Sequence, residues 1–291
     1  MPGDSGSHLV LFDQQIAVFI ANIVQAVLRV VPLGPADATG TPFLHFTIPA
    51  VTGQIKSDPD IAQHFENTVL YYAVTGRLDR ALGPVSFLDL PTPTHSRLSL
   101  IMQMAMWYFV LGHEYAHVLL GHLHTTGTRK GILAFVDAEA LDYSWQQEHD
   151  ADACGLVLAE AASAKRQGDP VLFAHLGICL FFDALDVMDR AIAVLQTGNE
   201  NALQLGSHPP PRLRKQHLHE LVLPRMRMDQ SDGEYVREGM REMASASEEV
   251  IRLLWERTRP RLLDLHRQGV SASPTWRTTP KQASDNQASP H

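Results

Sequence analysis

The sequence contains only two cysteines, Cys154 and Cys179, in a chain of 291 residues. Two thiols cannot supply the disulfide framework on which small secreted proteins depend. Both cysteines lie in apolar, helix-favouring stretches, where a free thiol usually serves as a small core residue. We therefore expect a protein that is stabilised by a packed core and works in a reducing compartment, which places it in the cytoplasm.

Clusters of positive charge are also missing. Lys and Arg number 24 against 32 Asp and Glu, the formal net charge is −8, and no basic block occurs. Nucleic-acid surfaces need concentrated positive charge, so we expect no nucleic-acid partner. Residues 1–7 contain Asp4 and no basic residue, which does not match the start of a secretory signal.

No apolar run is long enough to span a bilayer. A transmembrane helix needs about 20 apolar residues, whereas the run 98–111 is followed closely by the ionisable residues His113, Glu114 and His117. The stretch 13–31 has apolar residues at helical spacing, but polar residues interrupt it. We predict a buried helix in the first case, a core-packing amphipathic helix in the second, and a soluble protein without a membrane span.

The motif that organises the sequence is His-Glu-x-x-His, formed by His113, Glu114 and His117. Residues four apart project from the same face of a helix, so His113 and His117 can bind one metal ion together. Glu114 is rotated by about 100° from His113 and can reach a water bound to that ion without being a ligand. This arrangement is typical of zinc hydrolases.

A second motif places Glu148 and Asp152 one helical turn apart in an Ala-rich stretch that runs to about residue 165. Glu148 would complete a His₂Glu ligand set that leaves the fourth tetrahedral position for water, and Asp152 is placed to orient a ligand histidine. His149 and Asp150 are adjacent competitors for these roles. The interpretation without a metal is a solvated acidic helix start, which the helix dipole favours.

A third motif is Ser207-His208, followed by three prolines and by Arg212 and Arg214. The three motifs in this order, His-Glu-x-x-His, Glu-x-x-Ala-Asp and Ser-His-Pro with a later Arg, resemble the M48 group of gluzincin zinc metallopeptidases. The resemblance covers the chain from about residue 98 to residue 218. It implies a zincin-like metallopeptidase domain that binds Zn²⁺.

The resemblance also implies a role for each motif residue. The implied zinc ligands are His113, His117 and Glu148, with Glu114 as general base and Asp152 as the partner that orients a ligand. His208 and Arg214 would lie near the substrate or the developing oxyanion. Arg212 competes with Arg214, because the triple proline leaves the local register open.

The fold class that we predict is mainly α with a small β component (α+β). An active-site helix pair is expected, together with edge strands at about 44–48 and 85–90, where apolar and polar residues alternate between prolines. Residues 1–268 should form one domain, and 269–291, rich in Ser, Thr, Pro and Gln, should be disordered. Further helices are predicted over 60–82, 171–195 and 233–258, the last ending before Pro260. Asp183, Asp186 and Asp189 are interpreted as one solvated acidic face.

Together these features predict a zinc-dependent endopeptidase that hydrolyses a peptide or protein substrate through a zinc-activated water, with Glu114 as general base. The alternative is a regulatory or interaction protein with a structural or latent zinc site and little turnover. A fourth coordination position open to water would favour the enzyme. A site blocked by a chain segment would favour the alternative.

Overall fold

The computed structural model describes residues 14–32, 47–78, 87–122, 138–165, 171–202, 208–222, 224 and 233–273, most of them in helices. The helices are α1 (Gln14–Val30), α2 (Ile48–Ser57), α3 (Pro59–Thr75), α4 (Pro93–Leu119), α5 (Ala138–Ala164), α6 (Val171–Thr197), α7 (Pro211–His217), the π-helix η3 (Leu218–Val222) and α8 (Gly233–Arg267). No β-strand occurs among these described residues. The mainly helical fold is confirmed, and the expected edge-strand sheet is not found in this part of the chain.

The two expected strands have different outcomes. Most of 44–48 lies outside the described residues, but its last position, Ile48, begins α2. The hydroxyl of Thr47 accepts a hydrogen bond from an N–H of the first turn, and Pro49 occupies that turn, where its missing N–H removes no helical hydrogen bond. The proline that we interpreted as a strand boundary is therefore a helix start. Residues 87–90 have no regular structure.

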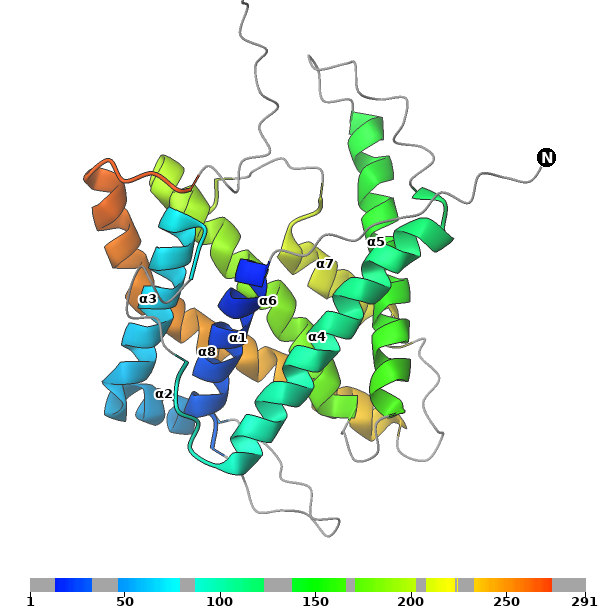
Figure 1. The fold of residues 1–291 in the computed structure, drawn as a ribbon, viewed down its shortest axis with the longest axis horizontal. Coiled ribbons are helices and arrows are strands. Elements are labelled where there is room, and N and C mark those ends of the chain that lie inside the picture. Colours follow the sequence, from blue (N-terminus) through cyan, green and yellow to red (C-terminus); the bar gives the residue numbers. More distant parts are fainter. Residues whose placement is uncertain are drawn as a thin grey trace, which may run out of the picture.

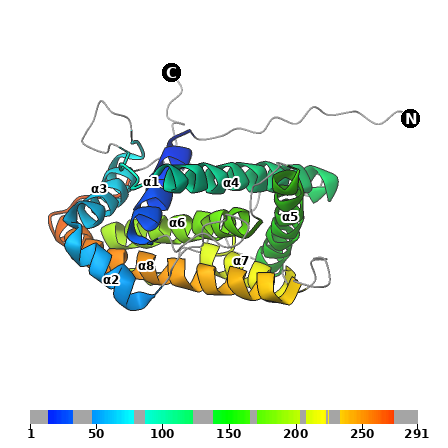
Figure 2. The ribbon, with the colours of Figure 1, turned by 90° about the horizontal axis from the view of Figure 1, so that it is seen from below.

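The long helices α4, α6 and α8 lie in three tiers (Figure 2), and α4 crosses the other two at a wide angle (Figure 1). Helix α6 lies in the middle and contacts both outer tiers. Helices α2 and α3 lie toward one end of the tiers, and α5 crosses the other end, packed along α4 (Figures 1 and 2). The C-terminal part of α4 and helix α5, which carry the first two motifs, therefore stand at one end of the molecule (Figure 2).

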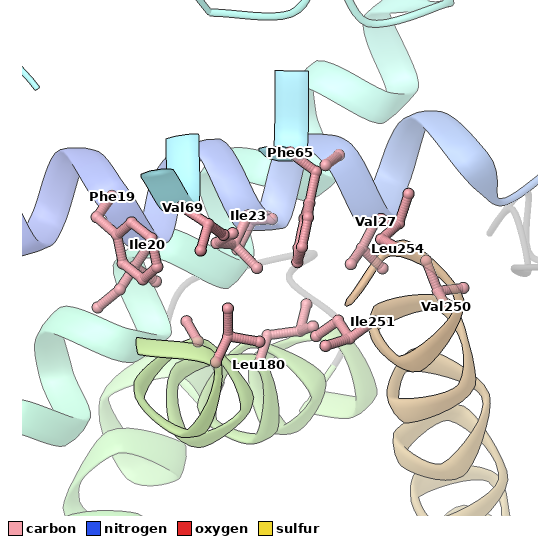
Figure 3. Packing of buried hydrophobic residues seen from close by; sticks show 14 of the residues in the cluster. Phe19, Ile20, Ile23, Val27, Phe65, Val69, Leu180, Val250, Ile251 and Leu254 are labelled. Atoms are coloured by element: carbon pink, nitrogen blue, oxygen red, sulfur yellow. The ribbon is translucent and has the colours of Figure 1, made fainter. Parts of the chain in front are cut away.

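The main hydrophobic core fills the space between α1, α3, α6 and α8. In Figure 3, Phe19 of α1 and Phe65 of α3 lie on the side of the cluster opposite Leu180 of α6, with Ile251 of α8 beside it. The apolar face of α1 is buried here, so the core-packing helix predicted over 13–31 is confirmed. Within the described residues, no helix is long and apolar enough to cross a membrane.

Helix α8 continues past Pro260 to Arg267, so the predicted end before the proline is wrong. Proline removes one helical hydrogen bond and usually breaks or kinks a helix. The burial of apolar side chains on both sides of Pro260 offsets that cost, because Trp255 and Leu262 are almost completely inaccessible to solvent. Of the tail expected to be disordered, residues 274–291 lie outside the described part, whereas the N–H of Ser273 donates to the Ala73 carbonyl at 2.9 Å.

The acidic residues of α6 do not form one solvated face. Asp183 has a side chain only 12% exposed, and its carboxylate lies 2.5 Å from the ammonium group of the buried Lys215 in α7. Burial raises the pKa of Asp183 to about 7, although the charge of Lys215 opposes that rise. This ion pair joins α7 to the central tier, a contact that helical spacing alone does not reveal.

Candidate metal centre

Helix α4 carries both histidines of the first motif. Its start is fixed by Thr92, whose hydroxyl accepts a hydrogen bond from the His95 N–H at 3.4 Å, and by a proline in the first turn. Near the other end of α4, His113 and His117 project from the same face, as their spacing predicts. Their Nε2 atoms lie 3.1 Å apart, and the two rings are nearly perpendicular, at 84°.

Two glycines let α5 approach this part of α4. A Cβ atom built on Gly155 would lie 2.9 Å from the backbone nitrogen of His113 and 3.1 Å from the carbonyl oxygen of Phe109. A Cβ built on Gly112 would lie 3.2 Å from the backbone of Gly155. Only glycine therefore permits this helix contact at its present separation. The close approach brings the second motif, at the preceding turns of α5, against the histidines.

Glu148 of α5 faces both histidines. Its Oε2 lies 3.5 Å from His113 Nε2, and its Oε1 lies 3.4 Å from His117 Nε2. Zinc bonds of 2.0–2.1 Å at tetrahedral angles place ligand atoms about 3.3 Å apart. The histidine nitrogens, 3.1 Å apart, meet that requirement, and the Glu148 carboxylate meets it with a different oxygen toward each histidine, at 3.5 and 3.4 Å. Glu148 Oε2 is buried and has no hydrogen-bond partner among the described residues, as a metal-binding oxygen would.

Asp152, fully buried one turn beyond Glu148, holds the other nitrogen of His113. Its Oδ1 lies 2.9 Å from His113 Nδ1. An Nδ1–H that donates to this carboxylate fixes the tautomer in which Nε2 carries a free lone pair for a metal. The competing assignments do not share this position, because Asp150 is exposed and hydrogen-bonded to Gln146, and His149 stacks on His217.

Arg214 of α7 completes the support of Asp152. Its guanidinium donates two hydrogen bonds to the carboxylate, Nε to Oδ2 at 2.8 Å and Nη2 to Oδ1 at 2.6 Å. Its Nη2 also lies 3.6 Å from Glu148 Oε2. Arg214 is buried whereas Arg212 is exposed, so the structure brings Arg214 into the cluster and leaves Arg212 outside it.

His208 lies at the exposed side of the cluster, and Glu114 is exposed on α4. His208 Nδ1 lies 3.0 Å from Glu148 Oε1, although 63% of the His208 side chain is exposed. Glu114 is also exposed, next to His113 on α4. From this position the negative charge of Glu114 helps to raise the pKa of Arg214. Ser207 lies outside the described residues.

The electrostatics of the cluster keep Glu148 and Asp152 ionised and His117 neutral. Burial raises the pKa values of both carboxyl groups, but His208, Arg214 and His113 outweigh burial at Glu148, and Arg214 and His113 outweigh it at Asp152, so both values lie below the usual range. Burial and the neighbouring His113 lower the pKa of His117 to about 4. These are the protonation states that metal binding requires.

One contact was not assigned from the sequence. His122, which lies just beyond the motif, has its Nδ1 3.0 Å from the Nδ1 of His117. His122 therefore contacts the Nδ1 atom of His117, as Asp152 contacts the Nδ1 atom of His113. Its position five residues after His117, past the helix end at Leu119, follows no helical spacing. His124 lies outside the described residues.

Comparisons with protein families, with curated proteins and with solved structures found no match for this chain. The resemblance to M48 peptidases therefore rests on the three motifs. What the structure adds is their meeting in space, since α4, α5 and the segment from His208 to Arg214 converge on one cluster.

Proposed function

We propose that the chain is a zinc-dependent endopeptidase of the M48-like gluzincin type, acting on a peptide or protein in the cytoplasm. The observation that carries the proposal is the spacing of His113 Nε2, His117 Nε2 and Glu148, which fits three ligands of one tetrahedral ion. Zinc held there would supply Lewis acidity, lowering the pKa of a coordinated water to about 7 and polarising a carbonyl group.

The protein residues around the ligands fit such a reaction. Asp152 and Arg214 hold His113 in one tautomer and one orientation, which fixes the ligand geometry before substrate arrives. Glu114 stands on the exposed side of α4, where solvent and a substrate can reach it. In this role Glu114 accepts the proton of the attacking water and passes it to the leaving amine. His208, also exposed, would donate a hydrogen bond to the substrate.

One contact favours the second function predicted from the sequence, a regulatory protein with a latent or structural zinc site. The imidazole of His208 lies on the Glu148 carboxylate at 3.0 Å, so a segment of the chain covers one oxygen of a ligand. A latent enzyme would have to move this segment before substrate binds. His208→Ala distinguishes the two functions, since it should raise turnover if the segment blocks the site and lower it if the imidazole contacts substrate.

The decisive experiment combines metal analysis with digestion of an unbiased peptide library. We expect about one zinc at this cluster and cleavage of a subset of peptides. Glu114→Gln should keep its zinc and lose cleavage, because the amide preserves the shape of the side chain but accepts no proton. Glu238→Gln, at an exposed position of α8, is the matched control and should retain cleavage.

Two results would overturn parts of the proposal. A zinc-loaded wild-type protein that cleaves no peptide would favour the regulatory function. Cleavage by Glu114→Gln at the wild-type rate would remove Glu114 from its role as base.

A further inference from the structure

A second group of potential metal ligands lies away from the first motif, between α6 and the π-helix η3. It consists of His175, Cys179 and His219, and one ligand atom from each lies within 4.8 Å of the other two. Cys179 Sγ and His219 Nε2 are 3.1 Å apart, and the rings of His175 and His219 stack with centroids 5.4 Å apart. His175 and Cys179 are buried.

Two local structures bring the group together. His175 and Cys179 are four residues apart on α6, so they project from one face of that helix. His219 comes from η3, whose wider turn follows α7 directly. Single π-turns are rare and occur frequently at functional sites. Leu218, the first residue of η3, is 2% exposed and fixes this segment in a second hydrophobic cluster with Ile178 and Phe182 of α6.

His175 is the most unusual member of the group. It is 1% exposed, and within the described part of the chain neither ring nitrogen has a hydrogen-bond partner. The nearest carboxylate oxygen, Glu160 Oε1 of α5, lies 3.4 Å from Nδ1 and is itself buried without a hydrogen bond. Buried polar groups of folded proteins are nearly always satisfied, and a bound ion is one recognised explanation of an exception.

We propose that His175, Cys179 and His219 bind a second zinc ion. One thiolate and two imidazoles form a donor set that suits Zn²⁺. With Zn–S and Zn–N bonds of ordinary length, a tetrahedral ion separates sulfur from nitrogen by about 3.5 Å, so Cys179 and His219 need to part by only about 0.4 Å. Glu160 faces His175 as carboxylates commonly face metal-binding histidines, and would hold its ring in place.

Metal binding requires deprotonated ligands, so Cys179 would bind as the thiolate and His175 and His219 as neutral imidazoles. At 2% exposure the sulfur is closed to substrates, so the group serves to join α6 to η3. The alternative is that no metal binds here and that Cys179 and His175 form a buried ion pair.

Cobalt substitution separates this site from the first one. The first cluster offers only nitrogen and oxygen ligands, whereas the second contains sulfur. Purified full-length protein, stripped of metal and titrated with Co²⁺, should therefore show a thiolate-to-cobalt charge-transfer absorption in the near ultraviolet, and total zinc in the native protein should approach two equivalents. Wild-type protein that binds Co²⁺ without this absorption would overturn the second site and leave the first untouched.

Variants assign the absorption to its residues. Cys179→Ser should abolish it and lower bound zinc by about one equivalent, whereas Cys154→Ser, the other free cysteine, should retain both. His113→Ala combined with His117→Ala should keep the absorption while losing the other zinc. Absorption that survives Cys179→Ser or disappears in Cys154→Ser would contradict the proposal. Because the wild-type spectrum is decisive by itself, the test holds even if Cys179→Ser fails to fold.

Discussion

Replacement of Gly155 by alanine tests whether the helix contact positions the metal cluster. The added methyl group would lie 2.9 Å from the backbone nitrogen of His113, well inside the distance of ordinary van der Waals contact. Both atoms that it meets most closely are backbone atoms of α4, so no side chain can rotate away. Helices α4 and α5 must therefore separate by about half an ångström, the shortfall from normal packing distances.

Gly239→Ala is the matched control for this substitution. Gly239 also lies within a long helix, α8, and the nearest atom to its built Cβ is the tip of Leu172 at 3.8 Å. Both substitutions gain the same helix propensity, about 0.8–1 kcal/mol. Their difference in unfolding free energy therefore isolates the cost of overpacking, which is typically about 1–3 kcal/mol. We expect Gly155→Ala to be less stable than Gly239→Ala by about 2 kcal/mol.

The two variants should also differ in zinc affinity. Moving α5 by about half an ångström can change the Glu148 to His113 separation by more than its present departure of about 0.2 Å from ideal spacing. Loss of ligand orientation typically weakens metal binding by about 10–100-fold. Chelator competition measures the affinity, and urea unfolding in the presence of excess chelator measures the stability. If Gly155→Ala matches Gly239→Ala in both measurements, the glycine contact does not position the site.

Three further predictions follow from individual side chains. Glu148→Ala should empty the site at ordinary zinc levels, whereas Asp152→Ala should bind about 10–100-fold more weakly and refill when zinc is raised; a zinc titration that reverses this order would refute the assigned roles. His64 is buried, and burial lowers its pKa to about 4, so its contribution to stability is complete above its usual pKa of 6.5 and is lost as the pH falls toward 4. Wild type should lose up to about 3 kcal/mol over this range that His64→Leu does not lose, which parallel urea titrations at several pH values would measure. Thr92→Ala should cost about 1 kcal/mol by removing the cap of α4, and Thr92→Ser should restore it; equal stability of all three proteins would show that the cap contributes nothing.

The sequence by itself determined the elements whose signals are local. Apolar periodicity predicted α1 and α6 nearly to their ends, because one buried face of a long helix repeats every three or four residues. The spacing of His113 and His117 predicted that they share a helix face, and Glu148 and Asp152 likewise. The strand predictions were weaker, because Pro49 bounds a strand and starts a helix equally well.

The tertiary structure decided which of these local features meet. Asp152 and Arg214 are 62 positions apart, and Arg214 lies on α7, a helix too short to show periodicity, so only folding shows that Arg214 rather than Arg212 reaches the carboxylate. Similarly, Cys179 looked like an ordinary core residue until η3 brought His219 to its sulfur. Local patterns record which face of a helix is buried, whereas contacts between distant polar groups depend on how helices cross, and at α4 and α5 that crossing depends on Gly155.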